Sequence, residues 1–134
     1  MTLLIAVLMS LPAEAPAANA EWVRVGGDDK AAEFVDAKSL VRVADEVRFR
    51  REIRFAPTRP EGFDRMAFSS VGSCRDRTVF EPAMSLHLGD HELMSTTFRK
   101  GRKTVLEVAP PNSPLGRALA FACDGSTGKE PAAP

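Results

Sequence analysis

Residues 47–55 constrain the fold more than any other segment of the sequence. Apolar and charged side chains alternate here, with Val47, Phe49, Ile53 and Phe55 on one side and Arg48, Arg50, Glu52 and Arg54 on the other. Because successive side chains of a strand point to opposite faces, this period of two predicts a half-buried β-strand. Arg51 interrupts the apolar side, so the strand either bulges there or carries an arginine that reaches a partner acid.

Further short strands are predicted on both sides of this segment. The β-forming runs are 21–25, 33–36, 66–73, 77–81 and 104–108. Turn-forming residues separate these runs. A turn at Lys100 and Gly101 leads into the last run. Antiparallel strands that follow one another in this way are typical of a meander.

One tight hairpin is predicted within residues 86–93. Glycine followed by aspartate at 89–90 suits a two-residue type II′ turn. That turn sets His87 opposite Glu92. It also sets Leu86 opposite Leu93.

A helix is predicted near the C-terminus. Ser113 is a good N-cap, and Pro114 suits the first helical position. The apolar stripe of this helix consists of Leu115, Ala118, Leu119 and Ala122. The expected fold is therefore an α+β domain, an antiparallel meander of about five to seven short strands packed with a C-terminal helix.

The N-terminus has the outline of a secretory signal. An apolar run at 3–11, too short to span a bilayer, precedes small residues that end at Ala20. Cleavage is expected after Ala20, with Ala15 as a second candidate, so the mature chain begins at Glu21. No Lys or Arg precedes the run, so either the signal is unusual or the true start lies upstream. The alternative is a buried N-terminal helix or strand, which the prolines at 12 and 16 disfavour.

This organisation divides the chain into a signal peptide at 1–20, a domain at 21–124 and a disordered tail at 125–134. The expected location is the periplasm, the medium or the cell surface, with no transmembrane span after cleavage. In an oxidising compartment, Cys74 and Cys123 are most simply a disulfide that closes a loop of about 50 residues. On the chain-entropy model, this loop stabilises the fold by about 4 kcal/mol. A redox pair or a metal site is the alternative, but neither a Cys-x-x-Cys motif nor suitably spaced further ligands are present.

The sequence contains no clear catalytic or cofactor motif. His87 and His91 are four residues apart, as metal ligands on a helix are, but the intervening turn points them to opposite faces of a hairpin. Ser85 lies near His87 without a nucleophile elbow or an oxyanion glycine cluster. The glycines at 26–27 lack the rest of a phosphate loop. We therefore expect no enzyme activity, no cofactor and no metal site.

Two basic features are candidate binding patches. They are the strand arginines Arg48, Arg50 and Arg54, and the cluster Arg99, Lys100, Arg102 and Lys103. Either can attract a protein or an acidic polymer, and the alternative is an ordinary solvated surface. The 18 basic and 18 acidic residues of the chain cancel, which argues against nucleic acid as the partner.

The chain resembles the bacterial surface-adhesin protein E family over about residues 21–123. The matching positions are Trp22, Phe34, Val35, Asp36, Ser39, Leu40, Arg42, Val47, Arg48, Phe49, Cys74, Arg77, Pro110, Asn112, Ser113 and Cys123. The resemblance implies an antiparallel sheet with a C-terminal helix, a disulfide between the two cysteines, export, and binding to host or matrix proteins. The chain departs from the family in having no lipid-anchor cysteine and no tyrosine.

The predicted function is that of an exported, noncatalytic binding domain with an envelope or host-matrix partner. The main alternative is a periplasmic structural or envelope-interaction protein without an adhesion role. A minor hydrolase that uses Ser85 and His87 is a third hypothesis. An exposed strand edge would also allow a homodimer.

Overall fold

The computed structural model describes residues 19–98 and 107–125, but not the side chains of residues 107 and 108. The apolar run at 3–11, the predicted turn at 100–101, the basic cluster at 99–103 and the tail from residue 126 lie outside the described residues. The elements are β1 (Trp22–Gly27), β2 (Ala31–Asp36), η2 (Ala37–Ser39), β3 (Val41–Val43), β4 (Glu46–Phe55), β5 (Arg65–Ser73), β6 (Thr78–Leu88), β7 (His91–Thr97), β8 (Glu107–Val108) and α1 (Pro114–Asp124). No helix of the described residues is long and apolar enough to cross a membrane.

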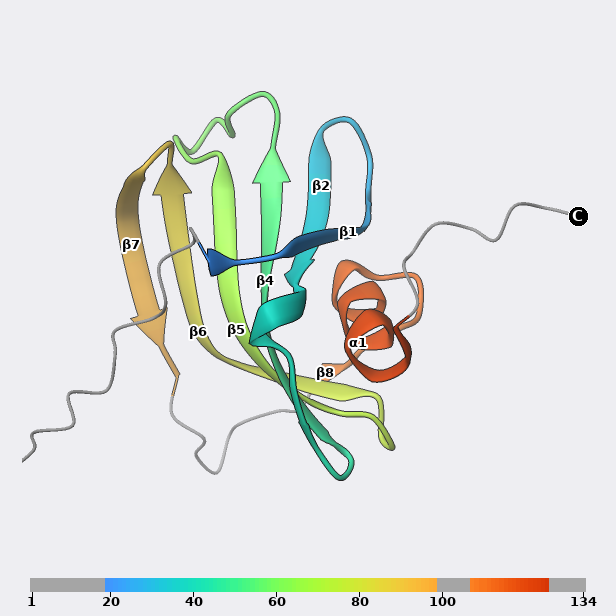
Figure 1. Cartoon of the computed structure of the whole chain (residues 1–134). Coiled ribbons are helices and arrows are strands. Elements are labelled where there is room, and N and C mark those ends of the chain that lie inside the picture. The colour runs from blue at the N-terminus through green and yellow to red at the C-terminus, as the bar shows by residue number, and fades with distance from the viewer. Residues whose placement is uncertain (1–18, 99–106, 126–134) are drawn as a thin grey trace, which may run out of the picture.

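The strands form one antiparallel sheet in the order β1-β2-β4-β5-β6-β7, with β3 paired to β4 and β8 paired to β6 (Figure 1). This order confirms the predicted meander with its C-terminal helix. Strand β3, a three-residue exposed strand that pairs with the start of β4, was not predicted. Strand β6 is continuous, whereas two separate strands were predicted, because Pro82 interrupts the strand pattern where the chain forms a bulge against β5.

Helix α1 covers one end of the sheet and begins where predicted. The side chain of Ser113 accepts a hydrogen bond from the backbone N–H of Gly116, 3.0 Å away, and Pro114 opens the first turn. Contacts of α1 with β1, β2 and β4 bury a core that consists of Val25, Val35, Val47, Phe49, Val79, Ala109, Ala118, Leu119 and Ala122. The predicted disulfide between Cys74 and Cys123 then ties the last turn of α1 to the end of β5. We call this side of the sheet the helix face.

Arg51 points to the helix face without a bulge in its strand. The pairing of β4 with β5 runs without a register shift from Glu46 to Arg54. Of the two alternatives for Arg51, a bulge or a partner acid, the partner acid is therefore confirmed. The guanidinium of Arg51 donates to both carboxylate oxygens of Glu81, at 2.8 and 2.7 Å, and stacks 4.0 Å from the centre of the Phe68 ring. A bidentate ion pair therefore compensates the one charge that interrupts the apolar pattern.

The hairpin between β6 and β7 confirms half of its predicted register. His87 pairs with Glu92, as expected, and Gly89 has a positive φ of 55°. Leu86, however, pairs with Met94 rather than Leu93. A bulge between Leu86 and His87 causes this shift and leaves Leu93 53% exposed.

We predict that Gly116→Ala destabilises the domain, although alanine is the better helix former. A Cβ at this position would overlap the backbone carbonyl of Pro110, which already accepts hydrogen bonds from the N–H and hydroxyl of Ser113. Urea unfolding should show a loss of about 1–3 kcal/mol, as is typical of overpacking. The higher helix propensity of alanine would by itself raise the free energy of unfolding by up to about 1 kcal/mol. A stabilised variant would therefore contradict the close contact between Gly116 and Pro110.

Candidate functional site

The sheet presents a polar face on the side opposite the helix face. Three rows of paired residues cross β4, β5, β6 and β7 there. The rows are Arg54, Arg65, His87 and Glu92; Glu52, Ala67, Ser85 and Ser95; and Arg50, Ser69, Ala83 and Thr97. None of these residues has a large apolar side chain. Because alternate residues of a strand share one face, this surface follows from the alternation in four successive strands.

The polar face is hollowed because its centre carries only small side chains. A hollow of about 470 Å³ lies over the rows, and its lining includes Ala67, Ser69, Ala83 and Ser85. Trp22 of β1 also lines it, since β1 crosses in front of the sheet (Figure 1). The volume falls within the range of about 300–1,000 Å³ typical of ligand sites. The hollow is therefore the candidate functional site.

A buried carboxylate lies at one end of the hollow. Glu52 is only 3% exposed and accepts a hydrogen bond from each of two arginines. Arg65 Nη1 lies 2.6 Å from one carboxylate oxygen, and Arg54 Nε lies 3.0 Å from the other. Such charge-assisted hydrogen bonds fix the direction of both guanidinium groups.

Aromatic rings hold Arg54 from the side of β1 and β2. Its guanidinium carbon lies 4.0 Å from the centre of the Phe34 ring and 5.4 Å from that of Trp22. These contacts are cation–π interactions, which are strongest where water is excluded. Trp22 is therefore fixed beside the hollow by the same arginine that Glu52 orients.

Asp36 holds Arg50, the β4 residue of the third row. It caps η2 by accepting from the backbone N–H of Lys38, and its second oxygen lies 2.8 Å from Arg50 Nη2. Burial opposes the ionisation of Asp36, but the hydrogen bonds from Glu21, Arg50 and Lys38 outweigh it and lower the pKa of the carboxyl. Asp36 is therefore a fully ionised, fully buried anion at neutral pH.

Ser85 and His87 form the contact that the hydrolase hypothesis requires. Ser85 Oγ lies 2.7 Å from His87 Nε2, inside the hollow. Burial, together with the positive charge of Arg65, lowers the pKa of His87, so the ring is neutral at pH 7. Among the described residues, no carboxylate accepts a hydrogen bond from the other ring nitrogen, Nδ1, as the orienting acid of a triad does. The pair therefore supplies two polar groups to the hollow.

The two histidines do not converge on one point. His91 pairs with Leu88, the neighbour of His87, so strand alternation places the two rings on opposite faces. In the described ranges, no three His, Cys, Asp or Glu residues are grouped as metal ligands.

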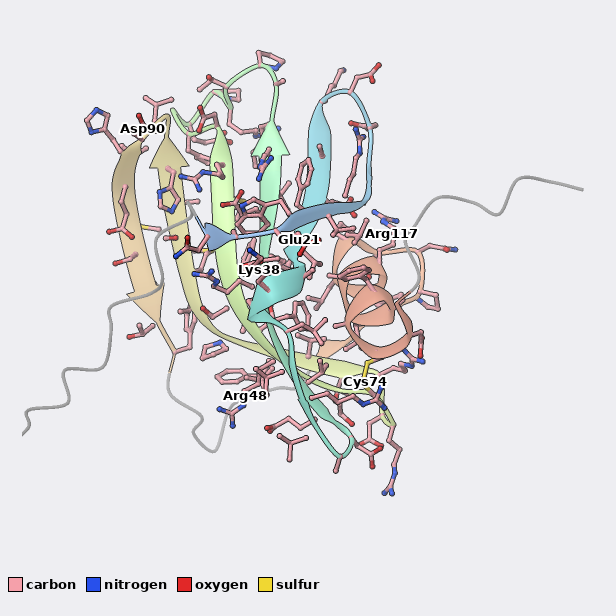
Figure 2. All side chains as sticks on the ribbon, viewed as in Figure 1. Glu21, Lys38, Arg48, Cys74, Asp90 and Arg117 are labelled. Atoms are coloured by element: carbon pink, nitrogen blue, oxygen red, sulfur yellow. A yellow bond between two sulfur atoms is a disulfide. The ribbon has the colours of Figure 1, made fainter. Side chains whose placement is uncertain are left out.

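The structure separates the arginines of the predicted strand patch. Arg50 lines the hollow and pairs with Asp36, and Arg54 pairs with Glu52. Arg48 instead forms an exposed ion pair with Glu46. Figure 2 shows Arg48 at the lower end of the sheet, far from Asp90. The other predicted patch, Arg99, Lys100, Arg102 and Lys103, lies outside the described residues and stays a prediction.

Most of the groups that line the hollow were not predicted as a site from the sequence. Trp22, Glu52, Arg65, Ser85 and His87 were not assigned together to any surface. The available signal was the occurrence of small or polar residues at alternate positions of β5, β6 and β7. Only the pairing register shows that these positions meet.

Comparison with models of protein families, with curated proteins and with solved structures finds no match. The resemblance to the surface-adhesin protein E family therefore stays a prediction from the residues.

We predict that Glu52→Gln lowers the free energy of unfolding by about 1.5–3 kcal/mol, because it removes the buried anion to which two partly exposed arginines donate. The matched control is Glu46→Gln, which removes an exposed partner of Arg48 and should cost less than about 1 kcal/mol. Urea unfolding of both variants measures the difference. Equal losses would contradict the role given to Glu52.

Proposed function

We propose that the chain is an exported, noncatalytic binding domain that captures a protein of the cell envelope or the host matrix in the hollow of the polar face. The observation that carries the proposal is a preformed hollow that extends to β7, the end of the strand order. Its lining combines an aromatic ring, fixed guanidinium groups and hydroxyls, which suits a polar ligand. The resemblance to surface adhesins supports the same class of function.

The charges of the hollow favour a protein over an acidic polymer. Arg50, Arg54 and Arg65 are each engaged with Asp36 or Glu52, and Asp90 and Glu92 add negative charge at the rim. The local field is therefore close to neutral and offers a polyanion little attraction. A peptide segment presents the mixture of donors, acceptors and side chains that such a lining can satisfy.

Strand β7 offers a way for the partner to attach. In the described part of the chain, β7 pairs with β6 on one side only. An extended segment of the partner can add to the free edge of β7 by main-chain hydrogen bonds. Its side chains would then reach Ser95 and Thr97, which line the hollow. The second candidate, a periplasmic envelope protein with no adhesion role, would use the same surface on a partner inside the envelope.

The test uses Ala67, whose small side chain keeps the centre of the hollow open. We predict that Ala67→Leu fills the hollow and weakens binding to immobilised laminin, fibronectin or solubilised envelope proteins by about tenfold or more, a change of about 1.4 kcal/mol. Ala67→Ser, which adds one oxygen, is the control and should bind as the unsubstituted chain does. Surface plasmon resonance measures the affinity of each variant.

A parallel variant reverses Arg99, Lys100, Arg102 and Lys103 to glutamate. If this variant loses binding while Ala67→Leu keeps it, the basic cluster is the binding surface and the hollow is not. Binding confined to envelope proteins would favour the periplasmic candidate, and binding to matrix proteins would favour adhesion.

A further inference from the structure

Glu21, the residue that follows the predicted cleavage site, is held by both of its backbone groups. Its backbone nitrogen donates to Asp36 Oδ1 at 2.9 Å, and its carbonyl accepts from the N–H of Ala37 at 2.8 Å. Figure 2 shows Glu21 beside Lys38, where the start of β1 meets η2. The folded domain therefore recognises the position at which the mature chain is expected to begin.

The acceptor at this position is suited to a positive charge. Asp36 is 0% exposed, and its two carboxylate oxygens accept hydrogen bonds from different groups. Oδ1 faces the backbone nitrogens of Glu21 and Lys38, whereas Oδ2 faces Arg50. A cation that replaced the Glu21 N–H would therefore not displace Arg50.

We propose that removal of the leader after Ala20 creates an α-ammonium group on Glu21 that forms an ion pair with the buried Asp36 and locks β1 across the polar face. The inference rests on the export in the proposed function. Hydrolysis of the bond between Ala20 and Glu21 consumes one water, whose oxygen joins the new carboxylate of Ala20. The released amine of Glu21 takes up a proton at neutral pH.

The change strengthens a contact that already has the right geometry. Before cleavage, the donor is a neutral amide N–H, and afterwards it is a charged ammonium at the same place. The bond to the ionised Asp36 is already charge-assisted, and a positive donor adds the direct attraction between two opposite charges. Glu21 is itself exposed, so the remaining ammonium N–H groups keep their contact with water, which limits the cost of desolvation.

The ion pair would also complete the candidate binding site. Trp22 follows Glu21 directly and lines the hollow, and Arg50 joins Asp36 to the same lining. Fixing Glu21, which directly precedes β1, therefore fixes Trp22 over the hollow. In the precursor, the donor is an uncharged amide and the contact is weaker, so the start of β1 is less firmly held and binding competence follows maturation.

The ion pair gives a definite pH dependence. The charged groups around the new amine are Asp36 at the end of β2, Arg50 of β4, Lys38 of η2 and the carboxylate of Glu21 itself. Pairing with Asp36 raises the pKa of the amine above its usual value of about 8. The added stability is therefore fully present below about pH 8 and is lost as the pH rises through the raised value.

The experiment compares chains 21–134 that have either a free or an acetylated amine at Glu21. Acetylation restores a neutral amide N–H and serves as the matched control. At pH 6.5, the free-amine chain should have a folding equilibrium constant about tenfold larger, which corresponds to a rise of about one unit in the pKa of the amine. The difference should vanish above about pH 10 and should be absent in Asp36→Asn. Equal stability of the two chains at every pH would overturn the proposal.

Two further measurements keep the test decisive if Asp36→Asn fails to fold. NMR titration of the unsubstituted chain gives the pKa of the Glu21 amine directly, and a value at or below about 8 would overturn the ion pair. The intact mass of the protein from separated periplasm, membrane and medium shows where the native chain begins. A start other than Glu21 would overturn the maturation step. Binding through the hollow is tested separately by Ala67→Leu, so the two proposals fail independently.

Discussion

The polar face depends on the burial of the Glu52 carboxylate between two arginines. A buried anion needs compensation, and Arg54 and Arg65 supply it from β4 and β5. Because both guanidinium groups are directed toward Glu52, Arg65 borders the hollow in a fixed position and the centre of the hollow is left to small side chains. A surface built of arginines is thereby converted from a basic patch into a nearly neutral hollow with directed donors.

The same principle connects the hollow to the N-terminal strand. Asp36 is a second buried carboxylate, and it holds Arg50 on one oxygen and the start of β1 on the other. Arg54 completes the connection by stacking against Phe34 and Trp22. Burial of these two acids stabilises the lining and also determines where β1 crosses the sheet. The helix face uses ion pairs as well, because Arg51 pairs with Glu81 and Arg117 of α1 pairs with the buried Glu33.

The elements that depend on local pattern were predictable from the sequence. The alternation in β4, the Ser113–Pro114 helix start and the disulfide pairing all follow from nearest-neighbour or compartment rules, and the structure confirms them. Features set by register were not predictable. The bulge beside His87 shifts the strand pairing, so that Leu86 pairs with Met94 instead of Leu93. The hollow forms only because alternate residues of four strands lie side by side in the sheet. Glu52 resembles a solvent-facing strand residue in the alternation, yet it is only 3% exposed and contacts two arginines.

The most direct test of this account is the environment of Trp22, the only tryptophan in a chain without tyrosine. Its fluorescence emission and acrylamide quenching should be measured in the unsubstituted chain, in Asp36→Asn and in the Glu46→Gln control, with circular dichroism to confirm folding. If buried acids hold β1 over the polar face, only Asp36→Asn shifts the emission to longer wavelength and increases quenching. An unchanged Trp22 in folded Asp36→Asn would contradict the account.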